Sequence, residues 1–233
     1  MIARSSIMVI GILLVASLSI ATIPKALAQT PPSAEDIKSY GGLHLAAHEG
    51  DVAVITKLIA DGADLEARDR AGRTALHVAA FASQDEVIQA LAEAGADLNA
   101  LEDRAYDIVT IAAVADDLDL LDLSLSLGAS AGNVTSPYDG TALIAAAHLG
   151  HHEVVDSLIK ADAPLDHVNN LNWTALIEAV VLGDGGPDHI ETLRLLIDAG
   201  ADQAIPDGQG ATPLQLAKAR GYEDMIGILE AAR

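Results

Sequence analysis

The chain contains no cysteine among its 233 residues. Disulfide bonds, thiol catalysis and lipid anchoring through an N-terminal cysteine are therefore excluded. Aromatic residues are also scarce, with one Trp, four Tyr and one Phe. A hydrophobic core must therefore be built from Leu, Ile, Val and Ala, and an oxidising compartment would leave the chain chemically unchanged.

Basic residues are also few relative to acidic ones. The chain has 13 Lys and Arg residues against 34 Asp and Glu residues, which gives a formal net charge of −21. Because such a chain repels phosphate groups, we expect no nucleic-acid partner. A basic protein or a cation is a more plausible partner, although the need for solubility alone would also explain the charge.

Sequence motifs of common enzymes are missing. There is no Gly-x-Ser-x-Gly, no phosphate-binding loop and no zinc-protease His pair on a helix. We therefore expect neither catalysis nor a cofactor. One catalytic alternative stays open, a hydrolase built on Glu178, Asp184 and His189.

A cluster of histidines raises the question of a metal site. His148, His151, His152 and Glu153 are close in sequence, but Gly150 interrupts the helical register between them. Tetrahedral metal sites need ligands on a common face, so we expect no metal site here.

Residues 1–28 have the layout of a cleavable secretory signal peptide. Arg4 precedes an uncharged apolar run from Ile7 to Ile23, and Ala26-Leu27-Ala28 stands before Gln29. We expect cleavage after Ala28 and a periplasmic location. The alternative is an uncleaved membrane anchor, which would be the chain's only contact with a membrane, because the apolar run is just long enough to span a bilayer. Residues 29–39, rich in Pro, Ser and Ala, indicate a flexible lead-in.

One segment returns along the rest of the chain at nearly constant spacing. Its clearest copy is Gly72 to Ala80, with the sequence Gly-Arg-Thr-Ala-Leu-His-Val-Ala-Ala. Copies start at residues 41, 74, 107, 141, 174 and 212, at steps of 33, 33, 34, 33 and 38 residues. A fixed period of this length indicates an array of helical repeats that share one core.

Each copy predicts a helix, a turn, a second helix and a polar loop. A leading Thr such as Thr74 can cap the first helix, and paired alanines allow neighbouring helices to pack closely. A glycine such as Gly50 ends the first helix, and another such as Gly95 ends the second. The polar loop that follows is interpreted as a hairpin finger. The third copy lacks the leading Thr, and the fifth is five residues longer.

These motifs, together with Leu-Ile-Asp-Ala-Gly-Ala-Asp near residue 200, resemble those of the ankyrin-repeat family, and the signal segment makes the chain similar to exported bacterial members. The resemblance covers residues 40–233. It implies an all-α repeat solenoid of six ankyrin repeats that binds a protein on the concave face made by fingers and first helices. We therefore expect a monomeric, non-catalytic interaction module or scaffold in the periplasm. The alternative is a small-ligand or metal sensor that uses the concave groove and residues 183–189.

Candidate partner-binding residues lie on the fingers or at the ends of first helices of such a solenoid. Large, rigid aromatic rings are typical binding anchors, although they could equally pack against neighbouring fingers. We expect the single tryptophan to contribute most. The candidates are Tyr40, Arg73, Phe81, Tyr106, Tyr138, His148, Leu149, Trp173, Val181, Leu182 and Asp184.

The fifth copy is the most distinctive. Its extra residues fall in Gly183 to His189, which we expect to be a loop that is either functional or merely tolerated. Glu178 stands where the other copies have apolar residues, so a buried carboxylate needs a partner there, which could be a backbone donor. His44 and His77 occupy the family's Thr-Pro-Leu-His position, where the resemblance implies hydrogen bonds that join adjacent fingers.

Overall fold

The computed structural model describes residues 29–232, so the expected signal peptide and its cleavage site lie outside the described residues. Between residues 29 and 232 the chain forms thirteen helices, and its only strand-like feature there is an isolated bridge between Thr135 and Gly140. None of these helices is long and apolar enough to cross a membrane.

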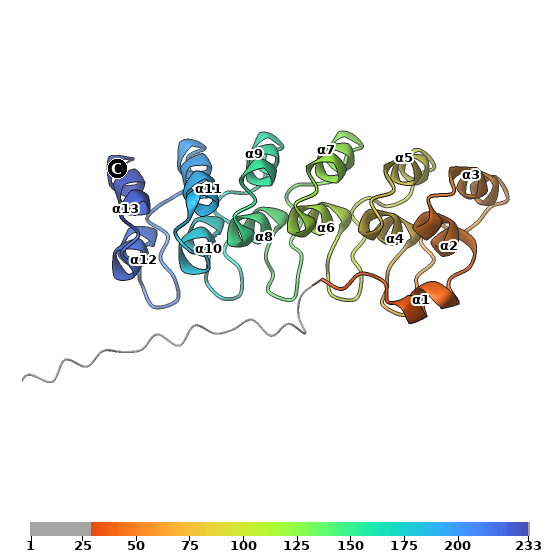
Figure 1. The fold of residues 1–233 in the computed structure, drawn as a ribbon, viewed down its shortest axis with the longest axis horizontal. Helices are drawn as coiled ribbons and strands as arrows, with labels where there is room; N and C mark the ends of the chain where they lie inside the picture. Colours follow the sequence, from red (N-terminus) through yellow and green to blue (C-terminus); the bar gives the residue numbers. More distant parts are fainter. Residues whose placement is uncertain (1–28, 233) are drawn as a thin grey trace, which may run out of the picture.

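After α1 (Ala34–Ser39), the helices alternate between two rows that run the length of an elongated stack (Figure 1). The first helices are α2 (Gly42–Glu49), α4 (Ala75–Phe81), α6 (Ile108–Ala115), α8 (Ala142–Leu149), α10 (Ala175–Val181) and α12 (Pro213–Arg220). The second helices are α3 (Val52–Ala60), α5 (Asp85–Glu93), α7 (Leu118–Ser126), α9 (His152–Lys160), α11 (Pro187–Asp198) and α13 (Glu223–Ala231). Each helix packs against its pair partner and the equivalent helix of the next pair, which confirms the all-helical solenoid.

Threonine caps begin most of the first helices, as the sequence predicts. The hydroxyl groups of Thr141, Thr174 and Thr212 each accept a hydrogen bond from the amide three residues further on, at 3.3 to 3.5 Å. In the third pair, which lacks the threonine, the carboxylate of Asp107 accepts the equivalent bond from the Thr110 amide at 2.8 Å. The degenerate copy therefore keeps its helix because aspartate replaces threonine in the same role.

Small and branched aliphatic side chains form one continuous core. Ala47, Ala79 and Ala147 are completely buried at the contacts between first helices. Leu76 and Leu143 are among the largest fully buried side chains. Alanine at the helix contacts allows the close stacking, and leucine fills the space between the rows.

Histidines join adjacent fingers, which confirms their expected structural role. The Nε2 atom of His44 lies 2.9 Å from the carbonyl oxygen of Arg73, and that of His77 lies 3.2 Å from the carbonyl oxygen of Tyr106. Burial lowers the pKa of His77 to about 4, despite the opposing effect of its backbone hydrogen bonds. The imidazole of His77 is therefore neutral at pH 7 and acts as a fixed link between fingers.

The lead-in does not match the expectation of a flexible segment. Ser33 and Asp36 form a capping box that starts α1, and the Asp36 carboxylate pairs with Nη2 of Arg73 at 3.0 Å. The carbonyl oxygen of Thr30 accepts a further bond from Arg73 at 3.3 Å. The segment from residue 29 therefore runs along the stack below the first helices, from the region of α6 to α1 (Figure 1).

The loop expected from Gly183 to His189 is present only in part, because Pro187, Asp188 and His189 belong to a helix. Helix α11 begins at Pro187 and has 12 residues, against 9 in α9, and the connector before it, residues 182–186, is longer than residues 150–151 before α9, so the insertion lengthens both the helix and the connector. This connector is tied to the next pair, because the Tyr222 hydroxyl donates to the Gly183 carbonyl at 3.0 Å. The Tyr222 ring lies against Gly185, where an added Cβ would be 2.8 Å from it.

Candidate functional site

A groove of about 260 Å³ lies between the fingers and the first helices α6, α8 and α10. We call it the finger groove. Its lining is mainly apolar, with Gln29 at one end and the carboxyl group of Glu178 among its polar groups. Its lining includes the side chains of Tyr106, Tyr138, Ile144, His148, Leu149, Asn169, Leu171 and Glu178.

The finger groove brings together four of the residues expected to bind a partner. Tyr106 and Tyr138 come from two successive fingers, and His148 and Leu149 come from the end of α8. Tyr106 is largely buried, at 7 % exposure, so it contributes to the wall more than to the rim. Leu149 is 41 % exposed and forms an apolar part of the rim.

Leu171 is a groove residue that the sequence reasoning missed. It is 37 % exposed and lies on the finger that precedes α10. Its neighbours Asn169, Asn170 and Asn172 are polar. An apolar residue among them was the sequence feature that could have identified Leu171 as a candidate binding residue.

Glu178 lies deep in the finger groove and is only 3 % exposed. Its Oε1 accepts a hydrogen bond from Nδ2 of Asn169 at 3.0 Å, whereas its Oε2 is buried and has no hydrogen-bond partner among residues 29–232. The carboxyl group thus has one of the partners that its burial requires, and this partner is a side-chain amide. Burial raises the pKa of Glu178 to about 7, against the lowering effect of the Asn169 hydrogen bond.

His148 lies next to the free oxygen of Glu178. Its Nδ1 is 3.4 Å from Oε2, a separation that would be an ion pair only with a protonated imidazole. Burial, reinforced by the charge of His189, lowers the pKa of His148, which favours the neutral ring. When Glu178 is ionised, the deep end of the finger groove therefore holds a carboxylate with one open acceptor position beside a neutral imidazole.

The structure does not assemble the three residues of the hydrolase alternative in this groove. Glu178 lines it, but Asp184 and His189 do not. The ring of His189 packs on Gly150, and its Nε2 donates to the carbonyl oxygen of His148 at 3.1 Å. Its Nδ1 lies 3.2 Å from the exposed carboxylate of Asp184.

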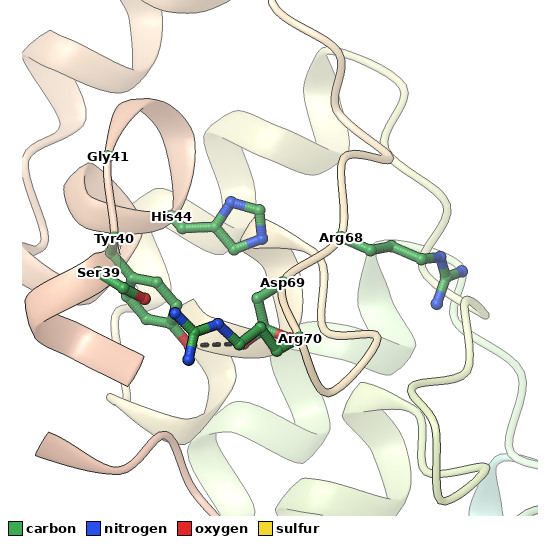
Figure 2. Close-up of a pocket in the computed structure, with 7 residues that line it drawn as sticks. All are labelled: Ser39, Tyr40, Gly41, His44, Arg68, Asp69 and Arg70. Carbon is green, nitrogen blue, oxygen red and sulfur yellow. Dashed lines mark hydrogen bonds between the residues drawn. The ribbon is translucent and has the colours of Figure 1, made fainter. Parts of the chain in front are cut away.

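Arg73 is inside the fold, not on the surface where we expected it. Its side chain is 3 % exposed and pairs with Asp69 at 2.7 Å and with Asp36 at 3.0 Å. The Tyr40 hydroxyl donates to the same Asp69 carboxylate at 2.7 Å. Figure 2 shows Tyr40 and Asp69 joined beside His44, in a pocket at the N-terminal end of the stack. These residues fasten α1 to the first two fingers.

The remaining candidates also lie outside the finger groove. Phe81, Trp173 and Val181 are half-buried and pack against the core. Leu182 is half-buried at the end of α10, and Asp184 is exposed. For Trp173, the geometry agrees with the packing alternative.

The histidines that raised the metal question contact other groups of the chain. His151 donates from Nδ1 to the carbonyl oxygen of Ala113 at 2.9 Å, and His152 begins α9. Across the described range 29–232, no group of three His, Asp or Glu side chains is arranged to hold a metal ion.

Comparisons with known proteins agree with this architecture. A family model described as ankyrin repeats (3 copies) matches residues 17–102 and 109–207. The ankyrin repeat protein YahD of Escherichia coli (strain K12) is 35 % identical over 189 residues, which cover 81 % of this chain and 94 % of YahD.

Two solved structures are similar as well. The ankyrin repeat domain ABAYE2397 from Acinetobacter baumannii AYE is 40 % identical, with a TM-score of 0.77, and the match covers 82 % of this chain and 96 % of that one. The ankyrin repeat protein EF0377 is 30 % identical, with a TM-score of 0.73 and the same two coverages. The repeated motif, the stacked helix pairs and these relatives together show that the chain belongs to the ankyrin-repeat family.

Proposed function

We propose that this chain is a non-catalytic protein-interaction module whose partner binds in the finger groove. Ankyrin repeats are protein-interaction modules, and solenoids of this kind bind through their extended concave surfaces. The observation that carries the proposal is the pair of exposed leucines, Leu149 and Leu171, at the rim of an apolar groove. Exposed apolar side chains gathered around a cavity mark an interaction surface more often than isolated ones do.

The size of the groove favours a protein partner over a small free ligand. A volume of about 260 Å³ lies below the roughly 300 to 1,000 Å³ of typical small-molecule sites. It can hold one or two side chains of a partner, which is how a central residue of an interface is usually seated. The net charge of −21 favours a basic partner and disfavours nucleic acid.

We further propose that six ankyrin repeats, starting at residues 41, 74, 107, 141, 174 and 212, make up a monomeric domain over residues 40–233. Each start falls within two residues of the beginning of a first helix, from α2 to α12. Light scattering of the purified chain should give the mass of one copy.

Site-specific photocrosslinking in cells tests the proposed binding face. A benzoylphenylalanine at position 149 should give an adduct with a partner protein, because Leu149 lies at the rim of the groove. Position 54 is the matched control, since Val54 on α3 is exposed to the same degree, 40 % against 41 %. Adducts that form equally at both positions, or only at position 54, would contradict the proposal.

We propose a periplasmic location on the strength of the sequence of residues 1–28. The expected mature protein begins at Gln29 and is released by osmotic shock. Mass spectrometry of the isolated protein measures its N-terminus directly. Intact Met1 in the membrane fraction would instead support the uncleaved anchor.

A further inference from the structure

Glu178 is an exception within the row of first helices. Equivalent positions carry Leu45, Val78, Ile111, Ala145 and Leu216, side chains that need no hydrogen bond. A buried carboxyl group is costly unless its oxygen atoms are paired, and Asn169 pairs with only one of them. The open acceptor at Oε2 lies in the finger groove.

We propose that Oε2 of Glu178 binds the primary ammonium group of a lysine side chain that a basic partner inserts into the finger groove. This inference rests on the proposed function of the groove as the partner surface, and it specifies the chemistry that the groove recognises. The chain's net charge of −21 would also draw such a partner towards it.

The number of free oxygens selects lysine over arginine. A guanidinium group binds a carboxylate best through two parallel hydrogen bonds, which require both oxygens. Oε1 of Glu178 is already bound to Asn169 at 3.0 Å, so only one oxygen is open. A single acceptor suits the compact charge of an ammonium group.

The walls of the groove fit the rest of a lysine side chain. Ile144, Leu149 and Leu171 offer apolar surface for its four methylene groups. Tyr106 and Tyr138 provide aromatic rings that attract a cation. Among the described residues that line the groove there is no Lys or Arg, so no cation of the chain competes for the site.

His148 controls access to the open oxygen. Its side chain is 32 % exposed and lies 3.4 Å from Oε2, so its ring must rotate aside or become a second acceptor for the ammonium group. A neutral imidazole can accept one hydrogen bond. The other titratable side chains that line the groove are His148 from α8 and Tyr106 and Tyr138 from the fingers, and His189 on α11 donates to the carbonyl oxygen of His148.

A fragment titration tests the inference without knowledge of the partner. The probe is n-butylammonium, which has the four carbons and the charge of a lysine side chain, and 1-butanol is the uncharged control. Binding to the purified chain at pH 8 is followed by the methyl NMR signals of Ile144 and Leu149. We expect butylammonium to bind at least about tenfold more tightly than butanol, because it adds a charge-assisted hydrogen bond.

Three variants isolate the carboxyl group. Glu178→Gln keeps the shape of the side chain and an acceptor for Asn169. Glu178→Leu introduces the residue found at the equivalent position of α12, Leu216. Both variants should therefore fold, and both should lose the preference for ammonium. Glu153→Gln on α9 removes an exposed carboxylate outside the groove and should keep it. Equal binding of the two probes to the unmodified chain, an unchanged preference in both Glu178 variants, or tighter binding of n-butylguanidinium would overturn the inference.

The two proposals fail in different ways. A partner adduct at position 149 without any ammonium preference would overturn the lysine site and leave the groove as a binding face. An ammonium preference that depends on Glu178, without an adduct at position 149, would leave an ammonium site in the groove but overturn the partner surface and, with it, a partner's lysine as the occupant.

Discussion

Glu178 and His77 are the two buried ionisable residues whose surroundings change their pKa most clearly. Burial raises the pKa of Glu178 and lowers that of His77, and the two residues differ in how completely they are hydrogen-bonded. His77 has hydrogen bonds on both ring nitrogens, to Thr74 and to the Tyr106 carbonyl group. Glu178 has one oxygen bound and one open. The first arrangement fits a structural link, and the second fits a group kept available for a partner.

The free energy of unfolding should report the burial of Glu178. Its folded pKa of about 7 lies above the ordinary value of 4.5, so the protonated carboxyl group is favoured in the fold. Its contribution is fully present below pH 4.5 and is lost as the pH rises through 7, by up to about 3 kcal/mol.

Urea denaturation at several pH values measures this effect against the Glu178→Gln variant. The variant should gain stability relative to the unmodified chain between pH 4.5 and pH 8. A stability difference that stays constant over this range would show that Glu178 is ionised normally in the folded chain.

His77 should behave in the opposite sense. Its folded pKa of about 4 lies below the ordinary 6.5, so its contribution to stability is present above pH 6.5 and is lost as the pH falls towards 4. NMR titration of the ring protons should show no protonation of His77 at pH 5.5. A midpoint near 6.5 would mean that the ring is exposed and that the finger link is absent.

At the scale of helices, local signals in the sequence predicted most helix ends, because threonine caps and left-handed glycines act within one turn. They did not predict α1 or the extended α11. Helix α1 is fastened by Arg73, which lies 37 residues from its partner Asp36. The connector before α11 is tied by Tyr222, 39 residues from Gly183. Such long-range contacts leave no mark in local composition, although the Ser33–Asp36 capping box at the start of α1 is a local signal that the sequence did contain.

Two glycine substitutions distinguish a helix end from a helix interior. Gly95 has a φ of 93° at the end of α5, so Gly95→Ala should cost about 1 kcal/mol although an added Cβ meets no atom within 4 Å. Gly227 lies within α13 and also has open space around it, so Gly227→Ala should stabilise the chain by roughly 0.5 to 1 kcal/mol. Thermal unfolding measures both. Shifts of the same sign would contradict the assigned helix ends.

At the scale of the whole molecule, the finger groove is a product of the stack. It needs three consecutive first helices and their fingers, and Gln29 closes one end by donating from its side-chain amide to the Thr110 carbonyl at 2.9 Å. The repeat register placed Tyr138, His148 and Leu149 near one another and singled out Glu178. It could not show that Arg73 is buried, because that burial depends partly on Asp36, which lies outside the repeat, and it left open whether Trp173 packs against the core.

The most direct test of a partner site in the finger groove compares one substitution inside it with one outside it. Leu149→Asp places a charge at the rim of the groove, and Val54→Asp places the same charge at an equally exposed position on α3. The partner identified by the adduct at position 149 should bind the first variant at least about tenfold more weakly and the second with unchanged affinity, while both variants keep the melting temperature of the unmodified chain. Full binding by Leu149→Asp together with weakened binding by Val54→Asp would place the partner on the opposite side of the solenoid and contradict the account.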